Sequence, residues 1–183
     1  GCPLVLGGPL PQVMAAKALA FKEANTPAFQ KYAHQVVANC RALASQFLSQ
    51  GIKLTTGGTD NHLLVIDVAS SFGLSGRQAE MALRDARFTV NRNTIPFDVH
   101  GPWYTSGVRI GPAAITTLGM KEKEMKEIAN AMVALLKETK PVKMEKTGEM
   151  SKAKTIIDPA VLERSHGQVF ELLSHFPLYP ELL

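Results

Sequence analysis

The strongest constraint on the fold is a long run of helical sequence in the N-terminal part of the chain. Residues 12–50 favour helix, with one interruption at Asn25-Thr26-Pro27, where Thr26 can cap a helix and Pro27 can take its first position. Beyond Pro27, apolar side chains recur at spacings of three and four residues until Gly51, a natural helix stop. We expect this stripe to be buried. Its members are Phe29, Tyr32, Val36, Val37, Cys40, Leu43, Phe47 and Leu48.

Short strand patterns follow the helical region. Residues 52–68 predict a hairpin, because Gly57-Gly58 and Asp60-Asn61 can reverse the chain before the apolar run LLVIDV. A short strand is expected over residues 88–91, and another in TSGVRIG, residues 105–111.

Helical patterns alternate with these strands. Ser75 and Gln78 have the spacing of a capping box, followed by the apolar positions Ala79, Ala82, Leu83 and Ala86. Residues 121–138 carry one apolar face, formed by Met125, Ile128, Ala129, Met132 and Leu135. Asp158-Pro159 begins a last helix that runs to about residue 175. The order of elements predicts an α+β fold, with helices packed on a mostly antiparallel sheet and a long helical segment before it.

Composition is that of an ordinary globular protein, with 45% hydrophobic and 20% charged residues in 183. The sequence contains neither a run of about 18 apolar residues nor a charged signal-peptide start, so we expect a soluble, cytoplasmic protein without a membrane span. Cys2 and Cys40 stand outside any metal-ligand spacing, which indicates reduced thiols and no structural zinc.

The formal net charge of +4 is concentrated in one segment. Between Lys140 and Lys154 there are five lysines and two glutamates, with few large apolar residues. We interpret residues 140–157 as a solvated basic linker. A nucleic-acid patch is the less favoured interpretation, because no aromatic side chains are interleaved with the charges.

One arginine stands out within a strand pattern. In TSGVRIG, alternation places Val108 and Ile110 on one face of the strand and Arg109 on the other, with Gly107 and Gly111. The glycines would leave room for a small ligand beside the guanidinium, which grips carboxylates or phosphates through two parallel hydrogen bonds. An ordinary surface or salt-bridged arginine is the alternative.

No GxSxG, Walker, HExxH or GxGxxG motif is present, so the sequence offers no self-contained catalyst. We favour a turn or sheet-edge position for His62 over the role of catalytic base. Gly7-Gly8 precedes a helical start, where free backbone N–H groups can receive a phosphate.

Four motifs in order, GGPL, GGTDNHLL, TVNRNTIPFD and TSGVRIG, resemble the C-terminal portion of serine hydroxymethyltransferases, pyridoxal-phosphate enzymes of one-carbon metabolism. The resemblance runs from about residue 6 to about residue 138, and more weakly to the last helix. It implies a fold-type-I enzyme, with residues 1–50 as the end of the large domain and its connecting helices, and residues 51–183 as the small C-terminal domain. The family's Schiff-base lysine lies in a Thr-His-Lys type motif, which this sequence lacks.

The resemblance also implies roles for particular residues. Arg109 matches the arginine that binds the carboxylate of serine or glycine, and Asn93 matches the asparagine that reaches the pteridine ring of tetrahydrofolate. Gly7 and Gly8 match the glycines that approach the phosphate of pyridoxal 5'-phosphate from the neighbouring subunit. A homodimer or homotetramer is therefore implied, and this chain alone would be catalytically incomplete.

Three positions depart from the family pattern: Gln12, Pro112 and Leu118. Two other functions stay open. The chain could be a non-catalytic binding or assembly module of the same fold, or part of a threonine-aldolase-like enzyme, which shares the carboxylate arginine but needs no folate. The NTIPFD motif favours the folate enzyme.

Overall fold

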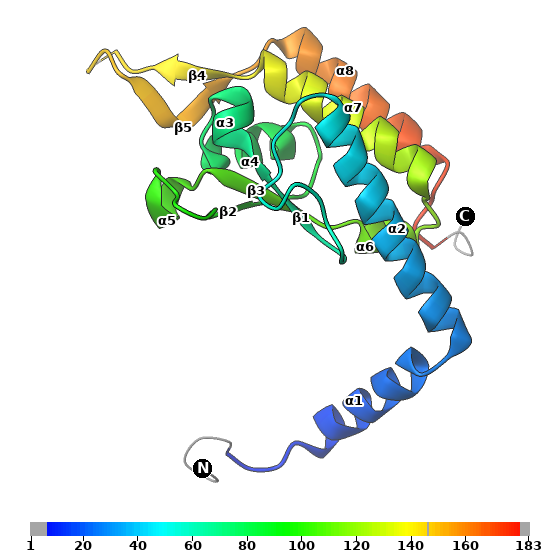
Figure 1. Cartoon of the computed structure of the whole chain (residues 1–183). Coiled ribbons are helices and arrows are strands. Elements are labelled where there is room, and N and C mark those ends of the chain that lie inside the picture. The colour runs from blue at the N-terminus through cyan, green and yellow to red at the C-terminus, as the bar shows by residue number, and fades with distance from the viewer. Residues whose placement is uncertain (1–6, 146, 180–183) are drawn as a thin grey trace. The chain divides into compact units, whose positions relative to one another are not determined.

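A computed structural model describes residues 7–145 and 147–179 of the chain, in two compact units, Gly1–Gln35 and Val36–Leu183. Helix α1 (Pro11–Ala24) and the first turns of α2 (Pro27–Ser49) belong to the first unit (Figure 1). The break between the two helices falls where the sequence predicts it. The Thr26 hydroxyl accepts a hydrogen bond from the Phe29 amide at 3.2 Å, which caps α2.

A three-stranded antiparallel sheet lies at the centre of the second unit. Its order is β1 (Leu64–Asp67), β3 (Gly107–Ile110) and β2 (Asn91–Asn93), so β3 is bonded on both sides. Val65 and Asn91 are the two cross-strand neighbours of Arg109. The predicted alternation along β3 is confirmed, since Val108 is fully buried while Arg109 is exposed.

Helices cover the core face of this sheet. The long ones, α7 (Glu122–Glu138) and α8 (Pro159–Ser174), pack side by side, and α4 (Gly76–Asp85) packs against both α7 and the sheet (Figure 1). The capping box at the start of α4 is confirmed: Ser75 and Gln78 bond each other's backbone N–H. Three short helices that the sequence did not predict are α3 (Val68–Phe72), α5 (Gly101–Tyr104) and α6 (Ala113–Thr117).

The hydrophobic core lies between one face of the sheet and α2, α4 and α7. Helices α4 and α7 bury the apolar faces expected of them, although Ile128 of α7 is only partly buried, and the stripe of α2 is buried only in part. On the stripe of α2, the residues at the two ends are exposed, at 44% for Phe29 and 42% for Leu48. The fully buried residues of this core include Cys40, Phe47, Ile66, Ala79, Leu83, Val108, Met125 and Leu135.

Two strand boundaries differ from the predictions. The first arm of the hairpin over residues 52–68 is reduced to a single antiparallel bridge between Leu54 and Ile66. The strand expected over residues 88–91 instead covers Asn91–Asn93, where β3 offers backbone partners. Asn93 therefore lies on a strand.

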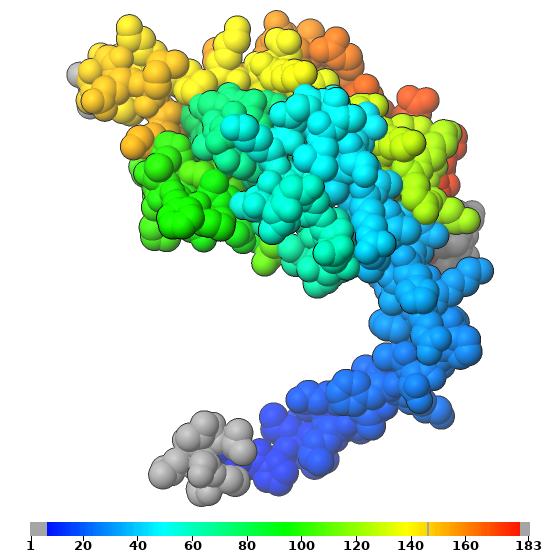
Figure 2. Space-filling model, in the orientation of Figure 1, coloured from blue at the N-terminus to red at the C-terminus, as the bar shows by residue number. Residues whose placement is uncertain are grey.

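Residues 140–157 are mostly exposed, as expected, but they form regular strands and not an irregular linker. This segment forms the two-stranded hairpin of β4 (Lys140–Lys143) and β5 (Met150–Ile156), which projects from the second unit in Figure 2. The capping-box residues of α4 hold β5 in place: Ser75 Oγ donates to the Lys152 carbonyl at 2.7 Å, and Gln78 Nε2 donates to the Ser151 carbonyl at 2.6 Å. Because these polar contacts hold the hairpin, its own sequence does not need the apolar pattern by which strands are usually predicted.

The predicted division at residue 50 between large-domain and small-domain parts stays a prediction.

Cys40 is a fully buried core residue, as expected, and burial raises the pKa of its thiol, with a partly opposing hydrogen bond from Thr59. Cys2 lies outside the described residues. None of the helices in the described part of the chain has the length and apolar composition that a membrane span requires.

Candidate functional site

The candidate site is the sheet face opposite the core. Because side chains alternate along strands, Arg109 shares this face with Asn91 and Asn93 of β2 and with Val65 and Asp67 of β1. All five residues are exposed or half-buried. The face therefore presents a cation and two amides together, carried on strands whose backbones are mutually bonded.

The guanidinium of Arg109 is held from one side. Its Nε donates a hydrogen bond to Asn91 Oδ1 at 3.3 Å. Among the described residues it takes part in no ion pair, unlike Arg92, which bonds Glu80 of α4 at 2.7 Å. This excludes a salt-bridged arginine within the described part of the chain, and the charge stays available to an anionic ligand.

A hollow of about 520 Å³ lies beside Arg109. His62, Thr89 and Asn91 contribute to its wall. The structure thus brings His62 to the same hollow as Arg109, in a turn position as predicted.

The glycines that flank Arg109 allow close packing of the chain against β3. A side chain on Gly107 would meet the Ile95 side chain at 2.6 Å and the Asn93 carbonyl at 2.9 Å, and one on Gly111 would meet the His62 carbonyl at 2.9 Å. Their missing side chains let neighbouring segments of the chain pack closely against β3. Gly111 also lines the hollow beside Arg109, so room for a ligand at that glycine stays a prediction.

Asn93 lies two residues along β2 from Asn91 and pairs with Gly107. Its Nδ2 donates to the Thr94 carbonyl at 2.6 Å. Arg109 and Asn93 are therefore brought to one face of adjacent strands, within the distance that one extended small molecule can bridge.

The loop after Asn93 is fixed by Asp98. One carboxylate oxygen accepts the N–H groups of Ile95 (3.2 Å) and Ser106 (2.8 Å), and the other accepts the His100 N–H (2.8 Å) and the Ser106 hydroxyl (2.7 Å). Burial opposes ionisation, but these hydrogen bonds outweigh it and hold the pKa of Asp98 below its usual range. The loop is thus closed on itself, with Phe97 at its tip fully exposed at a positive φ of 58°.

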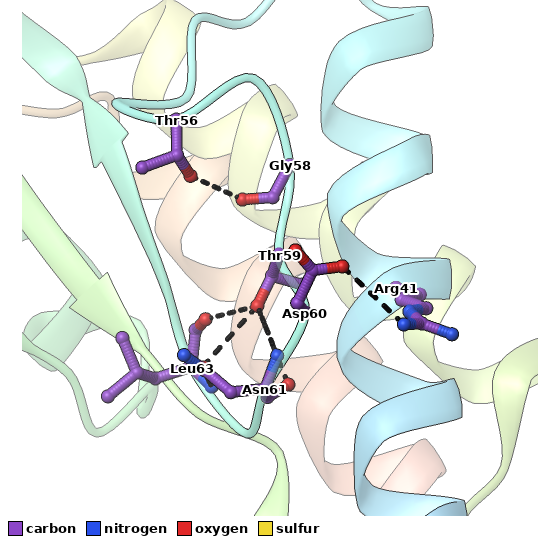
Figure 3. Close-up of polar contacts among 7 residues, drawn as sticks. All are labelled: Arg41, Thr56, Gly58, Thr59, Asp60, Asn61 and Leu63. Carbon is purple, nitrogen blue, oxygen red and sulfur yellow. Dashed lines mark hydrogen bonds and ion pairs between the residues drawn. The ribbon is translucent and has the colours of Figure 1, made fainter.

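The loop that precedes β1 is organised by its own polar residues (Figure 3). The Thr59 hydroxyl donates to the Leu63 carbonyl at 2.6 Å and accepts from the Asn61 amide at 3.2 Å, while Asn61 Oδ1 accepts from the Leu63 amide at 2.9 Å. Asp60 points to Arg41 of α2, 3.5 Å away, in an exposed ion pair that contributes little stability. The result is a defined path for the backbone that leads to His62.

Gly7 and Gly8 lie before α1, in the unit Gly1–Gln35, whereas Arg109 and Asn93 lie in the other unit. Both glycines are exposed, Gly7 has a φ of 66°, and a side chain on either would meet no atom within 4 Å. The residue at the N-cap of α1, Leu10, provides no side-chain hydrogen bond to the first turn. This backbone can approach an anion closely.

The three positions that depart from the family pattern lie at different points of the fold. Gln12 is exposed in the first turn of α1. Pro112 is the N-cap of α6, and its carbonyl accepts both the amide and the hydroxyl of Thr116, at 2.9 and 2.8 Å. Leu118 ends α6 and packs against the core. None of the three lies on the face that carries Arg109.

Reasoning from the sequence missed two residues of the site region. Asn91 was not singled out, although its distance of two residues from Asn93 places both on one face of a strand. Asp98 was missed because its four hydrogen bonds depend on how the loop closes, which no local spacing reveals. Among the described residues, no group of three or more His, Cys, Asp or Glu side chains could hold a metal ion.

These features define a class of protein: an α+β domain that presents an arginine on the central strand of a small antiparallel sheet, beside a hollow of about 520 Å³. The comparisons with known proteins place it in a family. The family model described as serine hydroxymethyltransferase matches residues 2–132. The chain belongs to the serine hydroxymethyltransferase family.

Individual relatives agree along the whole chain. It is 56% identical over 182 residues to the serine hydroxymethyltransferase of Treponema pallidum, covering 100% of this chain and 31% of the relative. The corresponding enzymes of Cutibacterium acnes and Salinispora tropica are 50% and 52% identical, again over 100% of this chain, which covers 37% and 38% of them. The chain thus spans about a third of the length of these relatives and corresponds to their C-terminal portion.

Proposed function

We propose that this chain is the C-terminal part of a pyridoxal-phosphate-dependent serine hydroxymethyltransferase of fold type I. The enzyme interconverts serine and tetrahydrofolate with glycine and 5,10-methylenetetrahydrofolate. The observation that carries the proposal is Arg109, exposed on the central strand with its guanidinium outside any ion pair in the described residues. The match of motifs and the identity to three enzymes of that name support it.

Arg109 binds the carboxylate of the amino acid. The guanidinium stays charged at all physiological pH values and offers parallel N–H groups that match the two carboxylate oxygens. Since β3 is bonded on both sides, the Cα of Arg109 is fixed, and so is the end of the substrate that it holds. The residue contributes binding and orientation, while proton transfer belongs to other groups.

The residues present fit the phosphate of the cofactor. The open space beside Gly7 and Gly8 and the uncapped start of α1 suit a close approach of backbone N–H groups to an anion. Pyridoxal phosphate, when bound, supplies the electron sink for the bond that breaks between the α-carbon and the hydroxymethyl group. In our proposal these glycines serve the active site of the neighbouring subunit, and the lysine that anchors the cofactor lies outside this sequence.

Asn93 contributes to the site for tetrahydrofolate. Its amide offers donors and an acceptor to the edge of a pteridine ring, and it shares a sheet face with Arg109. The neighbouring Asp98 keeps the following loop closed, so that the end of β2 stays in place. This position puts the folate next to the amino acid, as the transfer of a one-carbon unit requires.

A homodimer or homotetramer is the proposed assembly. Helix α1 buries none of its residues, although apolar side chains are spread around it and not confined to one face. Large apolar side chains there are exposed by 58% at Leu19, 64% at Met14 and 72% at Phe21. A helix of this composition is typical of an interface. The cytoplasmic location stays a prediction.

The test is to replace Arg109 by alanine and by lysine in the full-length enzyme. The alanine variant should lose measurable serine cleavage, and the lysine variant should bind serine at least about tenfold more weakly, because an ammonium cannot form the fork. Arg164, exposed on α8, provides the matched control, and Arg164→Ala should behave as wild type.

Near-normal turnover of Arg109→Ala at ordinary serine concentrations would contradict the proposal. The same assays separate the alternatives. A threonine-aldolase-like enzyme would cleave its substrate at the same rate with and without tetrahydrofolate, and a binding module would show no turnover in the full-length protein.

A further inference from the structure

Asn91 lies directly beside Arg109 and contacts the one guanidinium nitrogen that a substrate need not use. The two residues are cross-strand partners in the β2–β3 ladder, so their side chains leave the sheet on the same face. Asn91 Oδ1 accepts the hydrogen bond from Nε at 3.3 Å. Since Nε can only donate, the amide oxygen must face the arginine.

The position of this bond selects one edge of the guanidinium. A guanidinium can grip a carboxylate through its Nε and one Nη, or end-on through both Nη groups. With Nε bonded to Asn91, the side edge is taken, and the end-on fork of the two Nη groups is left for a carboxylate. Val65, the neighbour of Arg109 on β1, has no polar group that could compete for the fork.

We propose that Asn91 is a positioning residue: it holds Arg109 in the rotamer that presents the end-on fork to the carboxylate of the amino acid. This inference rests on the proposed function of Arg109. An arginine side chain has many rotamers, and fixing it before the ligand arrives removes part of the entropic cost of binding. Asn91 itself touches no reacting atom.

The experiment measures amino-acid affinity in full-length enzyme loaded with its cofactor. Asn91→Ala should weaken the equilibrium binding of glycine about tenfold, the loss expected for one hydrogen bond to a charged group. The KM for serine should rise by a similar factor, and kcat should change less. The matched control is Asn130→Ala on α7, which also removes exposed amide contacts, to Gln46 and Gln50, but outside this site.

A second ligand separates positioning from a general loss of structure. Ethanolamine carries the amino and hydroxymethyl groups of serine without the carboxylate. Its affinity should be the same in wild type and in Asn91→Ala, whereas a distorted site would bind both ligands more weakly. Asn91→Leu, which keeps the approximate shape and removes the acceptor, takes the place of the alanine variant if that one does not fold.

The outcomes distinguish the positioning role of Asn91 from the proposed function of Arg109. If Arg109→Ala abolishes glycine binding but Asn91→Ala binds glycine as wild type does, the positioning role is overturned and the proposed function stands. If Asn91→Ala loses glycine and ethanolamine equally, the residue is structural and the inference is again overturned. If glycine binds normally to Arg109→Ala, both the inference and the carboxylate-binding role of Arg109 fail.

Discussion

Replacing Gly76, at the start of α4, by alanine tests how closely this helix approaches the sheet. The Gly76 N–H donates to the Thr105 carbonyl at 2.9 Å, and a Cβ built on it would lie 2.5 Å from the Gly107 carbonyl and in conflict with the Thr105 hydroxyl. Ordinary contacts of a Cβ begin at 3.4 Å, so Gly76→Ala must push α4 nearly one ångström away from β3. Helix propensity favours alanine by at most about 1 kcal/mol.

The expected loss follows from these contacts. Overpacking against backbone atoms that cannot rotate away costs about 2–4 kcal/mol, and the shift also strains the hydrogen bond to Thr105. With a urea m-value of about 2 kcal/mol/M, the unfolding midpoint should fall by about 1–2 M. Trp103, the only tryptophan, lies on α5 in the same unit and reports the transition by fluorescence.

Gly58→Ala is the control for this experiment. Gly58 also lies in the second unit, but a side chain there would meet no atom within 4 Å. Its midpoint should stay within about 0.3 M of the wild type, since surface substitutions without contacts change stability little. Equal midpoints for Gly76→Ala and Gly58→Ala would refute the close approach of α4 to β3.

Three further predictions concern the folate residue and the loop that follows it. Asn93→Ala in the full-length enzyme should weaken the dependence on tetrahydrofolate while glycine binding is kept, and an unchanged folate affinity would refute the assignment. Asp98→Asn should destabilise the chain by about 1–3 kcal/mol at pH 7, because an amide cannot accept all four hydrogen bonds. The pKa of Asp98 is lowered in the folded state, so the stability difference between wild type and Asp98→Asn should be complete above the unfolded pKa of about 3.9. It should disappear as the pH falls through the folded pKa. Urea midpoints of both proteins measured from pH 7 to pH 2 will check this. Phe97→Asn should raise the free energy of unfolding by about 0.5 kcal/mol, and the urea midpoint with it, because asparagine tolerates the φ of 58° better than phenylalanine. A lower midpoint would show that the exposed ring contributes to stability.

Much of the fold could be predicted because it depends on local patterns. The break at Thr26, the capping box of Ser75 and the alternation around Arg109 all rest on neighbours a few residues apart in the sequence. The hairpin of β4 and β5 could not be predicted this way. Its residues are mostly exposed and polar, and it is held by side chains of α4 more than seventy residues away, at Ser75 and Gln78.

The site shows the same limit. Arg109 was found because a charge between apolar residues is a local signal. The contacts that shape its surroundings join different segments: Asn91 bonds it across strands, and Ile95 fills the space that Gly107 leaves. The sequence shows that Gly107 lacks a side chain, but only the structure shows whether a ligand or another part of the chain takes its place.

The position of Arg109 on the middle strand has a consequence for which amino acids the proposed enzyme can accept. A loop arginine could follow the carboxylate of a longer or shorter ligand, whereas this one is anchored by backbone bonds to β1 and β2. The distance from its fork to the rest of the active site is therefore set by the sheet. The sheet thus fixes where the α-carboxylate of the amino acid lies. Differences among substrates must be accommodated at the side-chain end, by residues outside this strand.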